Sequence, residues 1–144
     1  MARKDDMTLD LFQAPRPPVP SEGALNFALE LRHVLNEAIK RSGKSRYEIA
    51  MRMSELLGAD ISKSQLDSWT AESREGWRFP FEYAAAFEEA TGTYVLTELL
   101  TRIRGCRVLV GDDALLAEVG MIERQEQELK ARKKALRERL RRMR

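Results

Sequence analysis

The chain has 144 residues, of which 43% are hydrophobic and 33% are charged, and its formal net charge is +2. This length suffices for one compact domain with an extension, but not for two full domains. Because the net charge is small, any affinity for nucleic acid must come from the distribution of charge along the chain.

The residue content argues against an enzyme, a metal site and a cofactor. One cysteine, Cys106, and one histidine, His33, are too few for a structural zinc site or an internal disulfide. His33 lies in a helix that we expect to be buried, and no acid is placed in the sequence to orient it. The chain carries no glycine-rich phosphate loop and no Ser/His/Asp or Cys/His constellation, so we expect a non-enzymatic protein.

No apolar stretch is long enough for export or for membrane insertion. The N-terminus lacks the apolar run of a signal peptide. No other stretch approaches the ~20 apolar residues of a membrane span. We therefore expect a cytoplasmic protein with no membrane partner.

Residues 1–23 are predicted to form a disordered, proline-rich arm, because four prolines at 15, 17, 18 and 20 remove backbone donors and favour extended structure. Within it, residues 8–12 (Thr-Leu-Asp-Leu-Phe) are similar to short peptides that dock on the bacterial replication sliding clamp. This segment is a possible site for a protein partner. The alternative is a hydrophobic anchor that folds back on the domain.

Residues 24–110 are predicted to form a compact domain of five helices. The first spans 24–42, where apolar residues recur at helical spacing up to Gly43. The second runs from Ser45 to residue 57, and Glu48 completes a capping box with Ser45. Two further helices are expected from residue 79 to Gly92 and over about 94–104. Residues 106–110 suit either a brief strand or a packed connector.

The third helix, about 62–71, has the most secure start in the chain. Ser62 and Gln65 form a second capping box, and Ile61 and Leu66 occupy the two positions of a hydrophobic staple. Leu66 and Trp69 share one face, because they are three residues apart. We expect the polar residues of this helix to face elsewhere.

Residues 111–144 are predicted to form an oligomerisation helix, capped by Asp112 or Asp113. In a seven-residue repeat with positions lettered a to g, an apolar residue occupies every d position from Leu115 to Met143. Two of the four a positions are polar, Glu126 and Lys133. Such a narrow seam favours a coiled coil over a helix folded onto its own domain. We define the apolar stripe as the predicted oligomer interface: Leu115, Val119, Ile122, Leu129, Leu136 and Leu140.

Charge along this helix is strongly divided. Residues 112–128 carry a net charge of −5, and residues 129–144 carry +8. A parallel pair would set Glu118 against Glu123, whereas an antiparallel pair sets Glu123 against Arg137. We therefore predict an antiparallel homodimer. The alternative is a crossed pair that directs its basic ends toward DNA, which would have much the same sequence. The basic end has a second interpretation as a phosphate-binding tail.

Residues 35–93 resemble the lambda-repressor/Cro-like (xenobiotic-response-element type) helix-turn-helix family. Residues 45–50 (Ser-Arg-Tyr-Glu-Ile-Ala) are similar to the opening of that family's second helix. Residues 61–69 (Ile-Ser-Lys-Ser-Gln-Leu-Asp-Ser-Trp) are similar to its turn and recognition helix, and residues 78–92 to its fourth helix. The chain departs from the family at residues 54–60, which lengthen the second helix by well over a turn. The chain as a whole resembles small regulatory or accessory proteins of Mu-like bacteriophages and prophages, which implies a bacterial or phage-infected cell.

The resemblance implies sequence-specific binding of double-stranded DNA by a dimeric transcription regulator, with the recognition helix in the major groove. It implies one set of residues at base edges: Lys63, Ser64, Gln65, Asp67 and Ser68. It implies a second set at phosphates: Lys44, Arg46, Arg74 and Arg78. The alternative function is a protein-interaction module, in which the scaffold, the arm and the C-terminal helix bind another protein as an accessory or inhibitor.

Overall fold

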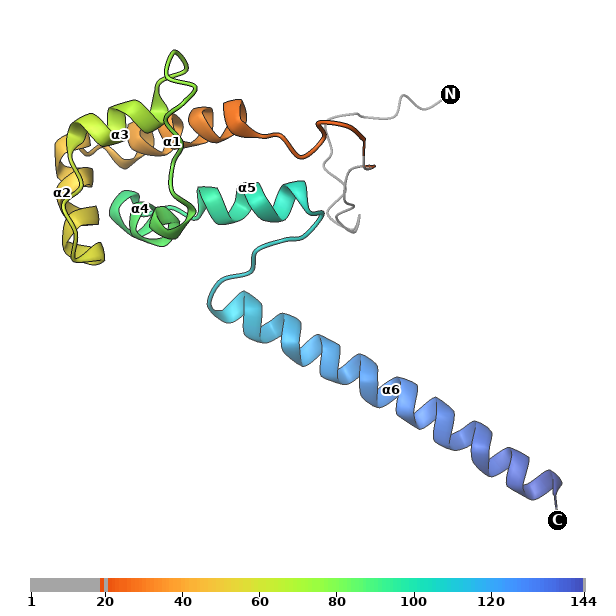
Figure 1. Cartoon of the computed structure of the whole chain (residues 1–144). Coiled ribbons are helices and arrows are strands. Elements are labelled where there is room, and N and C mark those ends of the chain that lie inside the picture. The colour runs from red at the N-terminus through yellow and green to blue at the C-terminus, as the bar shows by residue number, and fades with distance from the viewer. Residues whose placement is uncertain (1–18, 20, 144) are drawn as a thin grey trace, which may run out of the picture. The chain divides into compact units, whose positions relative to one another are not determined.

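The computed structural model describes residue 19 and residues 21–143, and the fold of this part is all-helical, as predicted (Figure 1). The prediction for residues 8–12 and most of the arm lies outside the described residues. The chain divides into two compact units, Met1–Val108 and Leu109–Arg144. The helical elements are α1 (Ala28–Ser42), α2 (Arg46–Leu57), α3 (Lys63–Thr70), the 3-10 turn η1 (Phe81–Tyr83), α4 (Ala84–Thr91), α5 (Val95–Ile103) and α6 (Asp112–Arg142).

Both predicted capping boxes are confirmed, and they determine where α2 and α3 begin. The Ser45 hydroxyl accepts from the Glu48 backbone N–H at 3.2 Å, and the Glu48 carboxylate accepts from the Ser45 N–H at 2.6 Å. That backbone hydrogen bond, followed by the one with the Ser45 side chain, lowers the pKa of Glu48. Ser62 and Gln65 exchange the same pair of bonds at 3.1 and 2.8 Å. Two orphan N–H groups are thereby satisfied at each helix start.

The core of the first unit lies between α1, α2, α3 and α4. Leu35, Ile49, Met53, Leu66 and Phe87 are fully buried. α2 packs on α4 and α3, while α1 packs on α5 and α3. Burial of these side chains supplies most of the favourable free energy of such a unit.

An aromatic cluster anchors α3 to the segment before α4. The Trp69 ring lies 5.4 Å from the Phe79 ring, edge to face, and 5.8 Å from the Tyr83 ring. Edge-to-face pairs add to the free energy of burial through the ring quadrupoles. Packing against this cluster therefore stabilises α3, because a helix of eight residues is too short to be stable by itself.

Four sequence predictions of local structure are wrong. The fourth helix does not begin at residue 79: residues 77–80 are irregular, η1 follows, and α4 begins at Ala84. α1 begins at Ala28, because residues 22–25 form a turn and Phe27 occupies the N-cap. The N-cap of α6 is Gly111, with φ +61°, rather than Asp112 or Asp113, and no side chain caps it. His33 is exposed and lies 3.6 Å from Glu72, because the buried face of α1 is formed by Leu35, Ala38 and Ile39.

The segment that joins α5 to α6 contains no regular element. Residues 106–110 form neither strand nor helix, and the described residues contain no β-strand. Leu109 and Val110 are about half exposed. None of the helices described here has the length and apolar content needed to cross a membrane.

Gly120 offers a test of how α6 is stabilised. It lies inside α6, and a Cβ added there meets no atom within 4 Å. Gly120→Ala is expected to raise the stability of α6 by up to about 1 kcal/mol, because alanine loses less backbone entropy in a helix. Thermal unfolding followed by circular dichroism at 222 nm measures this change.

Gly111→Ala is the matched control. A Cβ added at residue 111 also meets no atom within 4 Å, but the φ of +61° and ψ of −130° at this residue are unfavourable for a residue with a Cβ. Gly111→Ala should therefore lower stability. An equal or lower melting temperature for Gly120→Ala would contradict the prediction.

Candidate nucleic-acid interface

The candidate recognition helix α3 has one buried face and an exposed N-terminal end. Leu66 and Trp69 point into the core and are 0% and 5% exposed. Ser62, Lys63 and Ser64 are exposed, whereas Gln65 and Asp67 are half-buried. The exposed end is the part of a helix that can approach another surface without rearrangement of the core.

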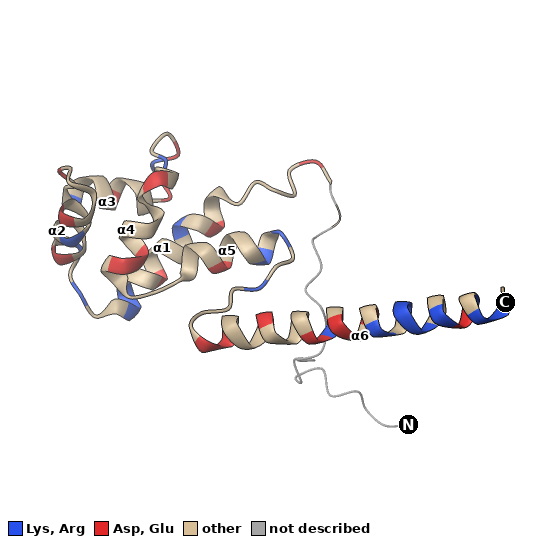
Figure 2. Ribbon diagram, turned by 90° about the horizontal axis from the view of Figure 1, so that it is seen from below, with Lys and Arg blue, Asp and Glu red and all other residues tan. Residues whose placement is uncertain are grey.

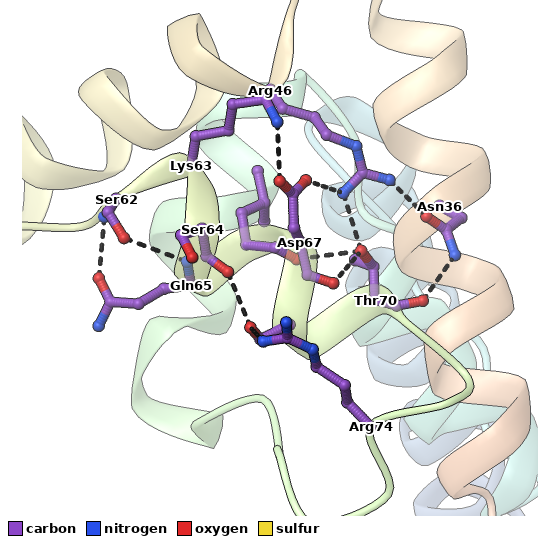
Figure 3. A network of polar contacts seen from close by, with 11 residues as sticks. Asn36, Arg46, Ser62, Lys63, Ser64, Gln65, Asp67, Thr70 and Arg74 are labelled. Atoms are coloured by element: carbon purple, nitrogen blue, oxygen red, sulfur yellow. Dashed lines mark hydrogen bonds and ion pairs between the residues drawn. The ribbon is translucent and has the colours of Figure 1, made fainter.

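Asp67 is held by two cations within the protein (Figure 3). The Lys63 ammonium donates to Asp67 Oδ2 at 2.7 Å, and Arg46 Nη1 lies 3.3 Å from Asp67 Oδ1. The Asp67 carboxylate is thus partly neutralised. It also orients the Lys63 side chain along the outer face of α3.

Arg46 joins three helices, which the sequence did not predict. Its Nη1 donates to Thr70 Oγ1 on α3 at 2.8 Å, and its Nη2 donates to Asn36 Oδ1 on α1 at 2.7 Å. The Asn36 amide in turn donates to the Thr70 carbonyl at 3.0 Å. Since Arg46 itself lies on α2, this network fixes α3 against both α1 and α2 (Figure 3).

Ser68 is not available for a base contact, and its prediction is wrong. The side chain is 2% exposed. Its hydroxyl donates to the Ser64 carbonyl at 2.9 Å and accepts from Arg74 Nη1 at 2.7 Å. Residue 68 lies on the side of α3 that faces the loop of residues 71–78, so that loop covers it.

Three of the four predicted phosphate-binding residues donate hydrogen bonds within the first unit, and the fourth, Arg78, is considered separately. Arg46 is mostly buried and Arg74 is bonded to Ser68, so both take part in internal hydrogen bonds. The Lys44 ammonium donates to the Ala90 carbonyl at 2.8 Å and links the start of α2 to α4. Arg78 is exposed in the loop before η1. Arg78 is the member of the set whose guanidinium is best placed to meet an external anion.

Ser54 holds the connection between α2 and α3. The Ser54 hydroxyl accepts from the Ile61 N–H at 2.8 Å and also lies 3.2 Å from the Ile61 carbonyl oxygen. Ile61, which is 6% exposed, is thereby held at the level of Ser54, at the start of the last turn of α2. Residues 55–57 therefore extend α2 beyond this contact, and α3 packs beside α2.

Arg32 is a further residue that sequence reasoning missed. It is 9% exposed and donates from Nη2 to the carbonyls of Arg74 and Glu75, at 3.2 and 3.3 Å. It therefore ties the loop after α3 to α1. No local sequence signal marks this role, because Glu30 and His33 beside it are polar as well.

The predicted oligomer interface on α6 is exposed throughout. The six members of the apolar stripe are between 51% and 65% exposed, and α6 has no buried residue. Figure 2 shows acidic residues concentrated toward the N-terminal end of α6 and basic residues toward its C-terminal end. Burial of several large apolar side chains of this kind against a partner is strongly favourable.

Charge in the first unit is nearly balanced. Residues 21–108 contain 12 Lys or Arg and 13 Asp or Glu, a net charge of −1. The corresponding count for residues 129–143 is eight basic residues and one acidic residue, a net charge of +7. The net positive charge of the described residues is therefore concentrated in the C-terminal half of α6.

Comparison of the chain with protein-family models, with curated proteins and with solved structures yields no match.

Proposed function

We propose that the protein is a sequence-specific DNA-binding regulator that acts as a dimer, with α3 as its recognition helix. The observation that carries the proposal is the two-sided character of α3. Leu66 and Trp69 hold its inner face in the core, while Lys63 and Ser64 stand exposed at its N-terminal end. Helix-turn-helix proteins use the N-terminal residues of such a helix to contact base edges in the major groove.

The contacts within the protein narrow the residues proposed to read bases. Lys63 is suited to guanine O6 and N7, and Ser64 to a base or a sugar. Gln65 retains its amide N–H groups, because only its Oε1 is used by the capping box. Asp67 is suited to accept from cytosine N4. Ser68 is no longer part of this set.

In this mechanism Lys63 exchanges one acceptor for another. In the free protein its ammonium is bound to Asp67, and both side chains are partly exposed. An exposed ion pair of this type contributes little to stability. Transfer of the ammonium to a guanine therefore costs little free energy, while Arg46 remains beside Asp67.

Dimerisation is proposed to occur through α6. An antiparallel pair buries the apolar stripe and brings Glu123 near Arg137 and Glu118 near Arg139. It also places Glu126 near Lys133, so that the opposite charges at the two polar a positions attract each other. The two recognition helices of a dimer would then contact two half-sites.

Lys63→Ala tests the DNA proposal. A preferred sequence is first selected from a random duplex library at two salt concentrations, because non-specific attraction weakens as salt rises. The ratio of affinities for the selected and a scrambled duplex is then measured by fluorescence anisotropy. We expect Lys63→Ala to reduce that ratio by about 5- to 150-fold, since one good base contact contributes about 1–3 kcal/mol of discrimination.

Arg52→Ala is the matched control for this experiment. Arg52 is also exposed and paired with an acid within its own helix, Glu55, but it lies outside the proposed contact set. It should leave the ratio unchanged. No enriched sequence, or an unchanged ratio for Lys63→Ala, would contradict the assignment of α3.

A second candidate function is a protein-interaction module, and exposed apolar side chains near the start of α1 favour it. Leu25, Leu29, Trp77 and Phe81 are at least half exposed. Leu25 and Trp77 line one hollow and Phe81 lines a second, and the two hollows share Phe27, Leu31 and Phe79. Exposed apolar patches commonly mark protein interfaces. Failure of the intact protein to bind any duplex at low salt would favour this function over the first.

A further inference from the structure

The C-terminal half of α6 carries the net positive charge of the described residues. Eight of the 15 residues from 129 to 143 are Lys or Arg, and all are exposed. The first unit, by contrast, has a net charge of −1. Phosphate contacts supply most of the sequence-independent affinity of DNA-binding proteins. The first unit is poorly equipped to provide them.

Four of these cations form one continuous face. Lys130, Lys134, Arg137 and Arg141 follow one another at intervals of four, three and four residues, which places them along the same side of a helix. With a rise of about 1.5 Å per residue they span roughly 16 Å. We call this set the basic face. Glu138, the one acid in this half, lies at its edge.

The basic face and the apolar stripe lie on different sides of α6. Each helical residue is rotated by about 100° from the one before it, so Lys130 is turned away from Leu129, and Arg137 from Leu136. In the heptad, Lys130 and Arg137 occupy e positions beside the seam, where Arg137 also faces Glu123 of the second copy. Lys134 and Arg141 occupy b positions, outside the seam and its flanks. Self-association through the stripe therefore leaves them facing solvent.

We propose that the basic face of α6 binds the phosphate backbone of duplex nucleic acid. B-DNA carries one phosphate per about 3.4 Å along each strand, so several phosphates lie within the length of this face. Lys and Arg side chains are long enough to adjust to that spacing, and binding releases condensed counterions. The choice of DNA as the biological ligand rests on the proposed function. In that function, α3 selects the sequence and α6 supplies sequence-independent affinity.

The residue content of α6 favours nucleic acid over an anionic membrane. Helices that lie in a membrane interface usually present Trp, Phe or Leu on a broad apolar side. Residues 129–143 contain no aromatic residue, and their apolar members are Leu129, Leu136, Leu140 and Met143 apart from two alanines. This narrow set is already assigned to self-association.

The test removes the two cations that self-association leaves free. Full-length wild type and Lys134→Gln/Arg141→Gln are titrated with a non-specific 30-base-pair duplex between 50 and 200 mM salt. The slope of log K against log[salt] should become shallower by about 1.8 per protomer, since each phosphate contact contributes about 0.9. Glutamine preserves helix propensity, and circular dichroism and light scattering verify the helix content and mass of the variant.

Arg124→Gln is the control, because Arg124 is exposed on the same helix but belongs to its acidic half and is paired with Glu128. It should leave the slope unchanged. An unaltered slope in the double variant would overturn the inference. So would tighter binding to vesicles of equal phosphatidylcholine and phosphatidylglycerol than to the duplex, with loss of that binding in the same variant.

The outcomes for α3 and α6 are distinguishable. If only the basic face is wrong, Lys63→Ala still lowers the preference for the selected sequence, and the double variant keeps the wild-type slope. If only the α3 assignment is wrong, Lys63→Ala leaves the preference intact, and the double variant still has a shallower slope.

Discussion

Leu129→Asp/Leu136→Asp is expected to convert the protein from a dimer to a monomer. Both residues lie in the apolar stripe, and both are more than half exposed in the single chain. In the proposed pair each leucine is buried against the second copy, so each aspartate would place an unpaired carboxylate in an apolar interface. Burial of an unpaired charge costs several kcal/mol. Two such charges per chain should abolish association at micromolar concentration.

Light scattering coupled to size-exclusion chromatography measures the mass of this variant. Met121→Asp is the matched control, because Met121 is a similarly exposed apolar residue of α6 at a c position, outside the stripe. It should remain dimeric. A dimeric mass for the double variant would show that the interface lies elsewhere, and a monomeric wild type would remove the self-association proposal altogether.

Arg46→Met is expected to lower the free energy of unfolding by about 2–3 kcal/mol. The substitution preserves much of the aliphatic volume but removes the bonds to Thr70, Asn36 and Asp67. Hydrogen bonds to charged groups contribute about 1.5–3 kcal/mol, and the partners left behind are half-buried or buried. Urea unfolding followed by tryptophan fluorescence measures the change, with Trp69 inside the affected region.

Arg52→Met provides the comparison for this substitution. Arg52 lies on the same helix, is about half exposed, and pairs only with Glu55 three residues away. Its removal should change stability by less than about 0.5 kcal/mol. If the two variants were equally stable, Arg46 would be free to serve as the phosphate ligand predicted from the sequence rather than as a structural residue.

This contrast bears directly on how α3 would be presented to DNA. Arg46, Asn36 and Thr70 fix the rotation of α3 about its own axis, while Trp69 fixes its depth in the core. A recognition helix must be held in this way, because small displacements misalign its contacts with base edges. The polar network is therefore a positioning device for the exposed end of α3.

Local sequence signals predicted the helices well. The capping boxes at Ser45 and Ser62 were recognisable because each depends on residues three positions apart. Gly43 and Gly58 end α1 and α2 with φ of +67° and +63°, a conformation that glycine adopts without strain. The seven-residue repeat likewise predicted one uninterrupted helix over residues 112–142.

The candidate site was only partly predictable, for a physical reason. Lys63, Ser64, Gln65 and Asp67 were chosen as members of one helix, and their spacing alone places them off the face of Leu66 and Trp69. Ser68 satisfies the same criterion but is buried by the loop that follows α3. The sequence spacing within a helix does not reveal what a later loop covers.

The helical class and the starts of α2 and α3 are predictable from local sequence, because they depend on residues within about two helical turns of one another. The division of charge along α6 follows from the order of its residues alone. Which polar side chains are free depends instead on how the helices pack. Arg46 meets Thr70 across 24 residues, Lys44 meets Ala90 across 46, and Arg32 meets Arg74 across 42. Buried polar groups must find partners, and the packing of the helices, rather than any local pattern, determines which partners are within reach.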